Sequence, residues 1–207
     1  IRPLRQLILS KQNSTLSKTV DVADLVFTRM GSAIHKGCEE AWKDPKNVKN
    51  ALKALGASED AANSIRINPP FVKHGENPVY VEQRAEKEIL DFIISGKYDL
   101  VIDGTLNDYK STSVWAYIYD SNSDNYIKQG SIYKWLSPDK ITEDYININY
   151  IFTDWSSAKA RADKKSYPQL KTITKKYNLW SIEETENWIM NRLETYKLHL
   201  NTPQEGL

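Results

Sequence analysis

Two acidic residues and a lysine fall where a tight turn would bring them together. Asp99 belongs to a β-type run that ends at Asp103-Gly104, and Asp108 and Lys110 follow on the returning segment. Asp-Gly between two such runs is a strong hairpin signal, because both turn positions tolerate positive φ. Asp108 and Lys110 are two residues apart on one strand and therefore project from the same face, with Asp99 across the turn. The pattern predicts that two carboxylates and an ammonium converge.

Such a cluster suits the hydrolysis of phosphodiesters. Paired carboxylates can hold Mg²⁺ or Mn²⁺, and a metal there polarises the phosphate and lowers the pKa of a bound water. A neighbouring lysine can orient or help deprotonate that water and offset charge in the transition state. An exposed strand salt bridge would explain an isolated Asp-x-Lys pair equally well, so the interpretation depends on other segments.

The elements around this hairpin can be outlined from apolar spacing and turn residues. Helices are predicted over 22–42, 48–55 and 126–136. Strands are predicted at 79–81, 88–94, 98–102, 105–110 and 146–152. A capping box, Ser181-Ile182-Glu183-Glu184, opens a final amphipathic helix. This order of elements indicates an α/β fold with a mixed central sheet flanked by helices.

A length of 207 residues favours one domain. We expect a single domain over 1–207, with the motif-bearing core at 31–155 and a basic segment and helix at 156–200. The start of the chain lacks a signal-peptide pattern, and no apolar run approaches the length of a membrane helix. A soluble, cytoplasmic protein without membrane contact is therefore expected.

Three segments resemble the PD-(D/E)XK nuclease superfamily, in particular its RecB-like branch. The stretch 96–112 is similar to the family's Gly-x-x-Asp strand, short turn and Asp-x-Lys followed by Ser or Thr. Gly31 to His35 is similar to a helix in which a glycine precedes a metal-reaching histidine by four residues, and Gln129 to Tyr133 to a Gln-x-x-x-Tyr helix. The resemblance implies a restriction-endonuclease-like core and a Mg²⁺- or Mn²⁺-dependent deoxyribonuclease.

The resemblance also implies roles for individual residues. Asp99 and Asp108 would be the main metal ligands, with the backbone carbonyl of Tyr109 as a third. His35 would complete or support the coordination. Lys110 would position the attacking water.

Three further residues have two readings each. The resemblance places Gln129 and Tyr133 in the catalytic site, where they help to position DNA or the lysine. Ordinary packing of one helix face over the sheet explains the same spacing. Glu82 is either an additional acidic metal ligand or a charged strand end.

Charge and composition narrow the cofactors and partners. The net charge of +1 gives no global attraction for nucleic acid, but the stretch 159–176 is locally basic. It is either a solvated face or a DNA-binding strip that begins with Lys159, Arg161, Lys164 and Lys165.

The six tryptophans include either a base-stacking surface or, more simply, core residues. The single cysteine, Cys38, cannot support an iron–sulfur cluster, so any metal must bind oxygen or imidazole ligands.

The combined expectation is a metal-dependent DNA exonuclease of the kind that phages use in recombination, acting in the host cytoplasm if phage-encoded. An endonuclease of the same superfamily is the first alternative. A catalytically idle nuclease fold that only binds DNA is the second. DNA is the expected substrate, and a homo-oligomer or a recombination partner protein is left open.

Overall fold

The structure, a computed structural model, describes residues 2–13 and 21–200, whose strands form one six-stranded sheet in the order β1-β2-β3-β4-β5-β6. The strands are β1 (Ile65–Ile67), β2 (Asn77–Ile89), β3 (Phe92–Ile102), β4 (Thr105–Thr112), β5 (Tyr145–Phe152) and β6 (Thr172–Asn178). The pairs β1–β2 and β4–β5 are parallel, whereas the other neighbours are antiparallel. The predicted α/β class with a mixed central sheet is therefore confirmed.

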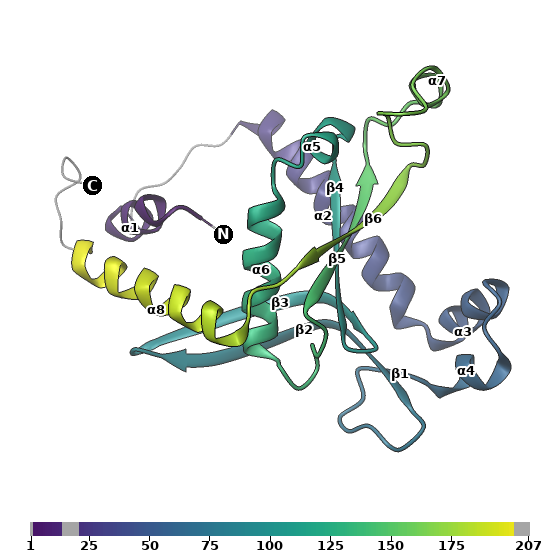
Figure 1. Cartoon of the computed structure of the whole chain (residues 1–207), viewed down its shortest axis with the longest axis horizontal. Coiled ribbons are helices and arrows are strands. Elements are labelled where there is room, and N and C mark those ends of the chain that lie inside the picture. Colours follow the sequence, from purple (N-terminus) through teal and green to yellow (C-terminus); the bar gives the residue numbers. More distant parts are fainter. Residues whose placement is uncertain (1, 14–20, 201–207) are drawn as a thin grey trace.

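Helices lie against both faces of this sheet (Figure 1). In the described part of the chain they are α1 (Leu4–Gln12), α2 (Val22–Lys43), α3 (Pro45–Ala54), α4 (Glu59–Ser64), α5 (Val114–Ile118), α6 (Ser123–Leu136), α7 (Ser157–Ala162) and α8 (Ile182–His199). Helix α6 packs against β2, β3, β5 and β6, and α2 packs against β2 and β4 from the other face. Within the described residues, no helix has the length and apolar character needed to cross a membrane.

The turn between β3 and β4 has the predicted geometry. Asp103 and Gly104 have φ angles of 48° and 70°, so both occupy the left-handed region. The Gly104 carbonyl accepts hydrogen bonds from the backbone N–H groups of Thr142 and Glu143, at 3.0 and 3.2 Å. A Cβ on Gly104 would lie 2.0 Å from the hydroxyl oxygen of Thr142. Glycine is therefore required there both for its conformation and for its size.

The predicted strand over 88–94 is wrong. Residues Leu90 and Asp91, with φ angles of 49° and 61°, form a turn in the middle of this range. Strand β2 runs up to this turn and β3 runs back from it, in register from Ile89 opposite Phe92 to Val79 opposite Ile102. The turn contains neither glycine nor proline, and this is why the pattern of apolar residues alone did not reveal it.

The helix predictions hold with shifted ends. Helix α2 covers the predicted range, and its stripe of Ile34, Cys38 and Trp42 is half-buried. Helix α3 starts before its predicted first residue, because the Asp44 side chain accepts hydrogen bonds from the N–H groups of the first turn and Pro45 follows it. The capping box at the start of α8 is confirmed.

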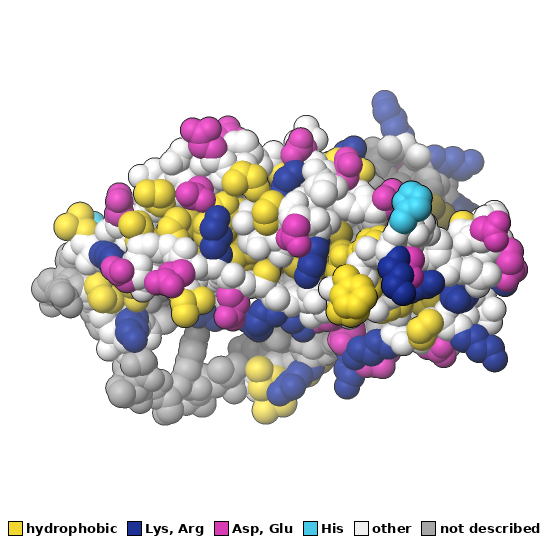
Figure 2. Space-filling model, turned by 90° about the horizontal axis from the view of Figure 1, so that it is seen from below, with side chains coloured by type: hydrophobic (Ala, Val, Ile, Leu, Met, Phe, Trp, Pro, Cys, Tyr) yellow, Lys and Arg dark blue, Asp and Glu magenta, His cyan; other side chains and the backbone are white. Residues whose placement is uncertain are grey.

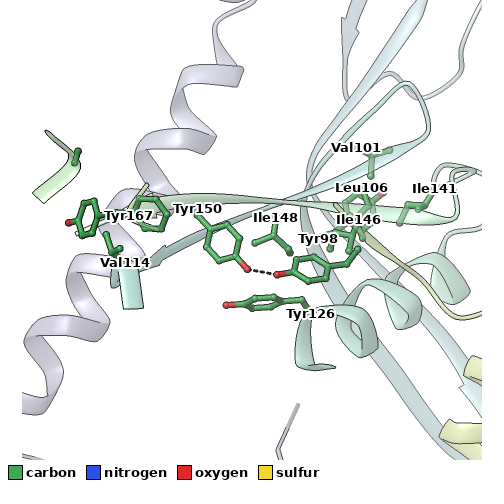
Figure 3. Packing of buried hydrophobic residues seen from close by; sticks show 13 residues of the cluster. Tyr98, Val101, Leu106, Val114, Tyr126, Ile141, Ile146, Ile148, Tyr150 and Tyr167 are labelled. Atoms are coloured by element: carbon green, nitrogen blue, oxygen red, sulfur yellow. Dashed lines mark hydrogen bonds between the residues drawn. The ribbon is translucent and has the colours of Figure 1, made fainter. Parts of the chain in front are cut away.

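The main core lies between the sheet and α6, and it is rich in tyrosine. Its buried members include Tyr126 and Tyr150, whose rings are 6.1 Å apart at 70°, beside Ile148 (Figure 3). The Tyr150 hydroxyl is 2.8 Å from that of Tyr177. A smaller cluster on the opposite face packs β2 and β3 against Trp42 of α2. The two cores hold α2 and α6 against the strands that carry the acidic hairpin.

Candidate active site where strands β3 and β4 separate

Strands β3 and β4 pair only next to their shared turn. Register positions end at Leu100 opposite Asn107, after which β3 continues with β2 and β4 continues with β5. Asp99 and Asp108 are the next residues on the two strands, so they lie where the strands separate. The two carboxylates are close enough to interact, since the negative charge of Asp99 helps to raise the pKa of Asp108. The hairpin therefore brings the two carboxylates within electrostatic range.

The Asp99 carboxylate is held from the α2 side. The Nδ1 atom of His35 lies 3.3 Å from Oδ2 of Asp99, and the backbone N–H of Tyr109 donates to the same oxygen at 3.0 Å. Burial alone would raise the pKa of Asp99, but these two hydrogen bonds together with the charges of His35 and Lys110 outweigh it, and the pKa is lowered. The hydrogen bond with Asp99 raises the pKa of His35 in turn. Asp99 is consequently ionised and fixed in orientation.

The Asp108 carboxylate has a different environment. The residue is 1% exposed, and its Oδ2 lies 2.6 Å from Nζ of Lys110 as an ion pair. Burial, with a further contribution from the Asp99 charge, raises the pKa of Asp108 to about 6 despite this ion pair. The site thus contains one carboxylate whose pKa is lowered and one whose pKa is raised.

A short relay connects Lys110 to α6. Its Nζ donates to Oε1 of Gln129 at 3.4 Å, and Nε2 of Gln129 donates to the hydroxyl of Tyr133 at 2.9 Å. The ring of Tyr126, one turn before Gln129, lies 5.7 Å from the Lys110 ammonium. The structure therefore brings together the predicted lysine, glutamine and tyrosine. The sequence analysis missed Tyr126, although the 126, 129, 133 spacing already places it on the same helix face.

Close approaches fix both helices against the strands of the site. A Cβ on Gly31 of α2 would meet the hydroxyl oxygen of Ser111 in β4 at 3.2 Å. A Cβ on Gly96 of β3 would meet the Tyr133 ring at 2.7 Å. Glycine at both positions lets helix and strand approach closely. The two glycines of the sequence motifs therefore have a packing role that the motifs alone did not indicate.

Glu82 lies in a neighbouring cavity of about 500 Å³, which is also lined by His35, Glu39 and Asp99. Its backbone adopts the left-handed region, with a φ of 53°. Its carboxylate pairs with the ammonium of Lys97, another residue that the sequence analysis did not select. This ion pair supports the interpretation of Glu82 as a charged strand residue, while the shared cavity keeps it next to Asp99.

The donor set fits a hard divalent cation. Among the described residues, no three His, Cys, Asp or Glu side chains form a ready-made metal cage. Mg²⁺ does not require one, because it is usually held by one or two carboxylates together with water and substrate phosphate. The buried Asp108 carboxylate has one ammonium beside it and the charge of Asp99 close by, and a cation held by both carboxylates would compensate the remaining negative charge. Asp99, Asp108 and the Tyr109 carbonyl are the groups that would hold it, and His35 would orient Asp99.

The predicted DNA-binding residues lie on and after α7, beyond the far end of β5 (Figure 1). Lys159, Arg161, Lys164 and Lys165 are all exposed. The structure therefore places them on a separate surface, and the relay from Lys110 to Tyr133 does not include them. Part of the predicted basic segment, 172–178, is strand β6.

No protein-family model matches the chain, and no curated protein sequence matches it. A candidate exonuclease from Eubacterium rectale is structurally similar, with a TM-score of 0.43 and 11% identity, covering 95% of this chain and 73% of that chain. The protein SSO0001 is similar with a TM-score of 0.36 and 15% identity, covering 97% of this chain and 86% of that chain. At these scores the similarity carries no argument, so the assignment depends on the residues described above.

Proposed function

We propose that this protein is a metal-dependent DNA nuclease that hydrolyses phosphodiester bonds by direct attack of water. The observation that carries the proposal is the convergence of three groups, since the buried Asp108 carboxylate is paired with the Lys110 ammonium and its pKa is raised partly by the charge of Asp99. Two carboxylates close together in a desolvated site repel each other, and one ammonium does not compensate both. A divalent cation held between them would supply the remaining positive charge.

Each residue of the site has a defined task in this proposal. A bound Mg²⁺ or Mn²⁺ supplies Lewis acidity to the phosphate and makes a water more acidic. Asp99 and Asp108 supply the negative charge that retains the cation. Lys110 orients the attacking water and offsets the charge that develops on the phosphate oxygens. Gln129 and Tyr133 limit the positions available to the lysine ammonium.

Exonuclease action is the form of this activity that the resemblance to the RecB-like branch supports. Digestion of end-labelled linear DNA and of a closed circle, each with and without Mg²⁺ or Mn²⁺, tests it. We expect degradation of the linear DNA to depend on metal, with the closed circle left intact. Cleavage of the circle would instead indicate an endonuclease.

Two variants and one matched control test the mechanism. Asp108→Asn and Lys110→Met should abolish cleavage, and Asp108→Asn should also abolish the heat of Mn²⁺ binding in calorimetry. Asp103→Asn is the control, because Asp103 lies exposed in the turn of the same hairpin and asparagine tolerates its positive φ. Parent-rate cleavage by Asp108→Asn in the presence of metal would contradict the proposal.

A further inference from the structure

Two large aromatic side chains are exposed together at α5. Trp115 is 47% exposed and Tyr119 is 74% exposed. Their rings are stacked, with centroids 6.1 Å apart and an interplanar angle of 22°. Aromatic side chains of this size normally bury most of their surface. A stacked pair open to water offers its outer faces to another flat ring, and nucleic-acid bases bind proteins in this way.

This aromatic pair is attached rigidly to the strand of the site. Strand β4 ends at Thr112, and the Ser113 hydroxyl then caps α5 by accepting the N–H of Ala116. The Val114 N–H donates to Oδ1 of Asp154 at 2.7 Å, which fastens the start of α5 to the segment after β5. From Lys110 to Ser113 is roughly 10 Å at the usual rise of a strand. That equals about three rises of a DNA strand in stacked, duplex-like geometry, and fewer nucleotides when the strand is extended.

Positive charge lies next to the aromatic pair. The ammonium of Lys159 in α7 is 5.8 Å from the centre of the Trp115 ring. Within the described residues, Arg161, Lys164 and Lys165 make no ion pair. The one acid among them, Asp163, accepts the backbone N–H groups of residues 165 and 166 with its carboxylate. These cations are therefore available to a ligand.

The rest of the basic segment is already used within the protein. Lys175 pairs with Asp120 at 2.8 Å, and Lys176 lies over the Tyr145 ring at 3.2 Å from its centre. On the face of the molecule seen from below, basic and acidic side chains are interspersed (Figure 2). The α5–α7 end combines cations that are unpaired within the described residues with a stacked pair of exposed aromatic rings. A nucleic-acid strand matches that combination because every nucleotide brings both a phosphate and a flat base, whereas an acidic peptide offers a ring only where it carries an aromatic residue.

We propose that the α5–α7 surface, formed by Trp115, Tyr119, Lys159, Arg161, Lys164 and Lys165, binds single-stranded DNA leading to the site. Bases stack on the two aromatic rings, and phosphates lie along the cations of α7 and the turn after it. Duplex DNA hides the faces of its bases, so the surface selects single strands. The inference rests on the proposed function, because the bound DNA is proposed to lead to the active site on β4.

The stacking part is tested by anisotropy of a short labelled oligothymidine in EDTA, where no cleavage can interfere. We expect Trp115→Ala/Tyr119→Ala to bind it roughly tenfold or more weakly than the parent protein. Phe71→Ala is the matched control, since Phe71 is 72% exposed on the loop between β1 and β2. Parent-like affinity of the double variant would overturn the inference, and so would an equal loss of affinity for a blunt duplex.

The phosphate part is tested by the salt dependence of the same binding. Arg161→Ala/Lys164→Ala/Lys165→Ala should lower the slope of log affinity against log salt by roughly two, because each phosphate contact contributes about 0.7 on a single strand. Lys46→Ala, on the exposed start of α3, serves as the control. An unchanged slope in the triple variant would overturn this part.

The two proposals can fail separately. If the parent cuts no DNA but Trp115→Ala/Tyr119→Ala still loses binding, the nuclease proposal fails and this inference stands. If the parent cuts DNA and the double variant binds normally, the nuclease proposal stands and this inference fails.

Discussion

Two lysines, each paired with an aspartate, contrast sharply in this fold. Lys134 of α6 donates to the carbonyls of Thr142 and Glu143, at 3.1 and 3.0 Å, and to Oδ1 of Asp144 at 2.5 Å. These three acceptors match the three protons of an ammonium. The Lys134 cluster is thus complete, and it fastens the loop between α6 and β5.

The Lys110 cluster is incomplete by comparison. Lys110 contacts Asp108 at 2.6 Å and reaches Gln129 only at 3.4 Å, and the Asp108 carboxylate is 1% exposed with its pKa raised to about 6. The lysine therefore has three acceptors in one region and two in the other. This difference agrees with a stabilising role for the Lys134 cluster and with the catalytic role proposed for the Lys110 cluster, since perturbed titratable groups gather mainly at functional sites.

The largest effect should come from removing the buried carboxylate of Asp108. Asp108→Asn should slow cleavage at least about a thousandfold, equivalent to about 4 kcal/mol of barrier. Its melting temperature in EDTA should equal or exceed that of the parent, because a buried charge is lost. Gel-based cleavage rates and calorimetric melting measure the two quantities. A marked fall in melting temperature would show that Asp108 stabilises the fold, and the contrast between the two clusters would disappear.

The reverse result is expected for the complete cluster. Lys134→Met keeps the aliphatic stem but leaves two carbonyls without a donor, so unfolding free energy should fall by about 3 to 4 kcal/mol. Cleavage per folded molecule should be unchanged at a temperature where the variant is folded. Urea unfolding and active-fraction kinetics test this. Loss of cleavage in the folded variant would place Lys134 in the catalytic machinery.

The pH dependence of stability should separate the parent from Asp108→Asn in metal-free buffer. The native pKa of Asp108, about 6, lies above its ordinary value of 3.8, so the native state holds this proton more tightly than the unfolded chain. The unfolding free energy of the parent, relative to that of the variant, should therefore fall as the pH rises from about 4 to about 6 and then level off. The difference is at most about 3 kcal/mol. Parallel curves for the two proteins would contradict the raised pKa.

The smallest effect should come from the residue that orients the stable carboxylate. His35→Gln removes the imidazole from Asp99 and should weaken Mn²⁺ binding about tenfold to a hundredfold, as the loss of ligand-orienting partners generally does. Titration calorimetry measures it, and Lys36→Gln on the adjacent exposed position is the control. Unaltered affinity in His35→Gln would show that the backbone N–H of Tyr109 holds Asp99 unaided.

The hairpin at the centre of the site was predictable because its signal is local. Asp103-Gly104 determines the turn, and the turn determines which strand positions face each other. The motif helices α2 and α6 were predictable for the same reason, from apolar spacing and caps within one segment. The Lys110–Gln129–Tyr133 relay was anticipated only through the family resemblance, since it joins a strand to a helix.

Other features depend on contacts that no short segment encodes. The turn at Leu90-Asp91 uses two ordinary residues in left-handed geometry, so the 88–94 range looked like one strand. Strand β6 was not predicted because its stretch of the sequence is rich in lysine. The charge of Lys175 in this strand is balanced by Asp120, which lies in a loop distant in the sequence. The exposure of Trp115 was likewise unpredictable, since sequence does not distinguish a surface tryptophan from a buried one.

Gly96 lies where a larger residue would displace the relay that holds Lys110. It carries no chemical group, yet a methyl group there would push on the Tyr133 ring, which is bonded through Gln129 to the lysine of the site. Gly96→Ala should therefore lower the turnover rate by shifting the position of the Lys110 ammonium, with every charged side chain still present. Substitution at this position of β3 is a way to slow cleavage and so trap a bound substrate.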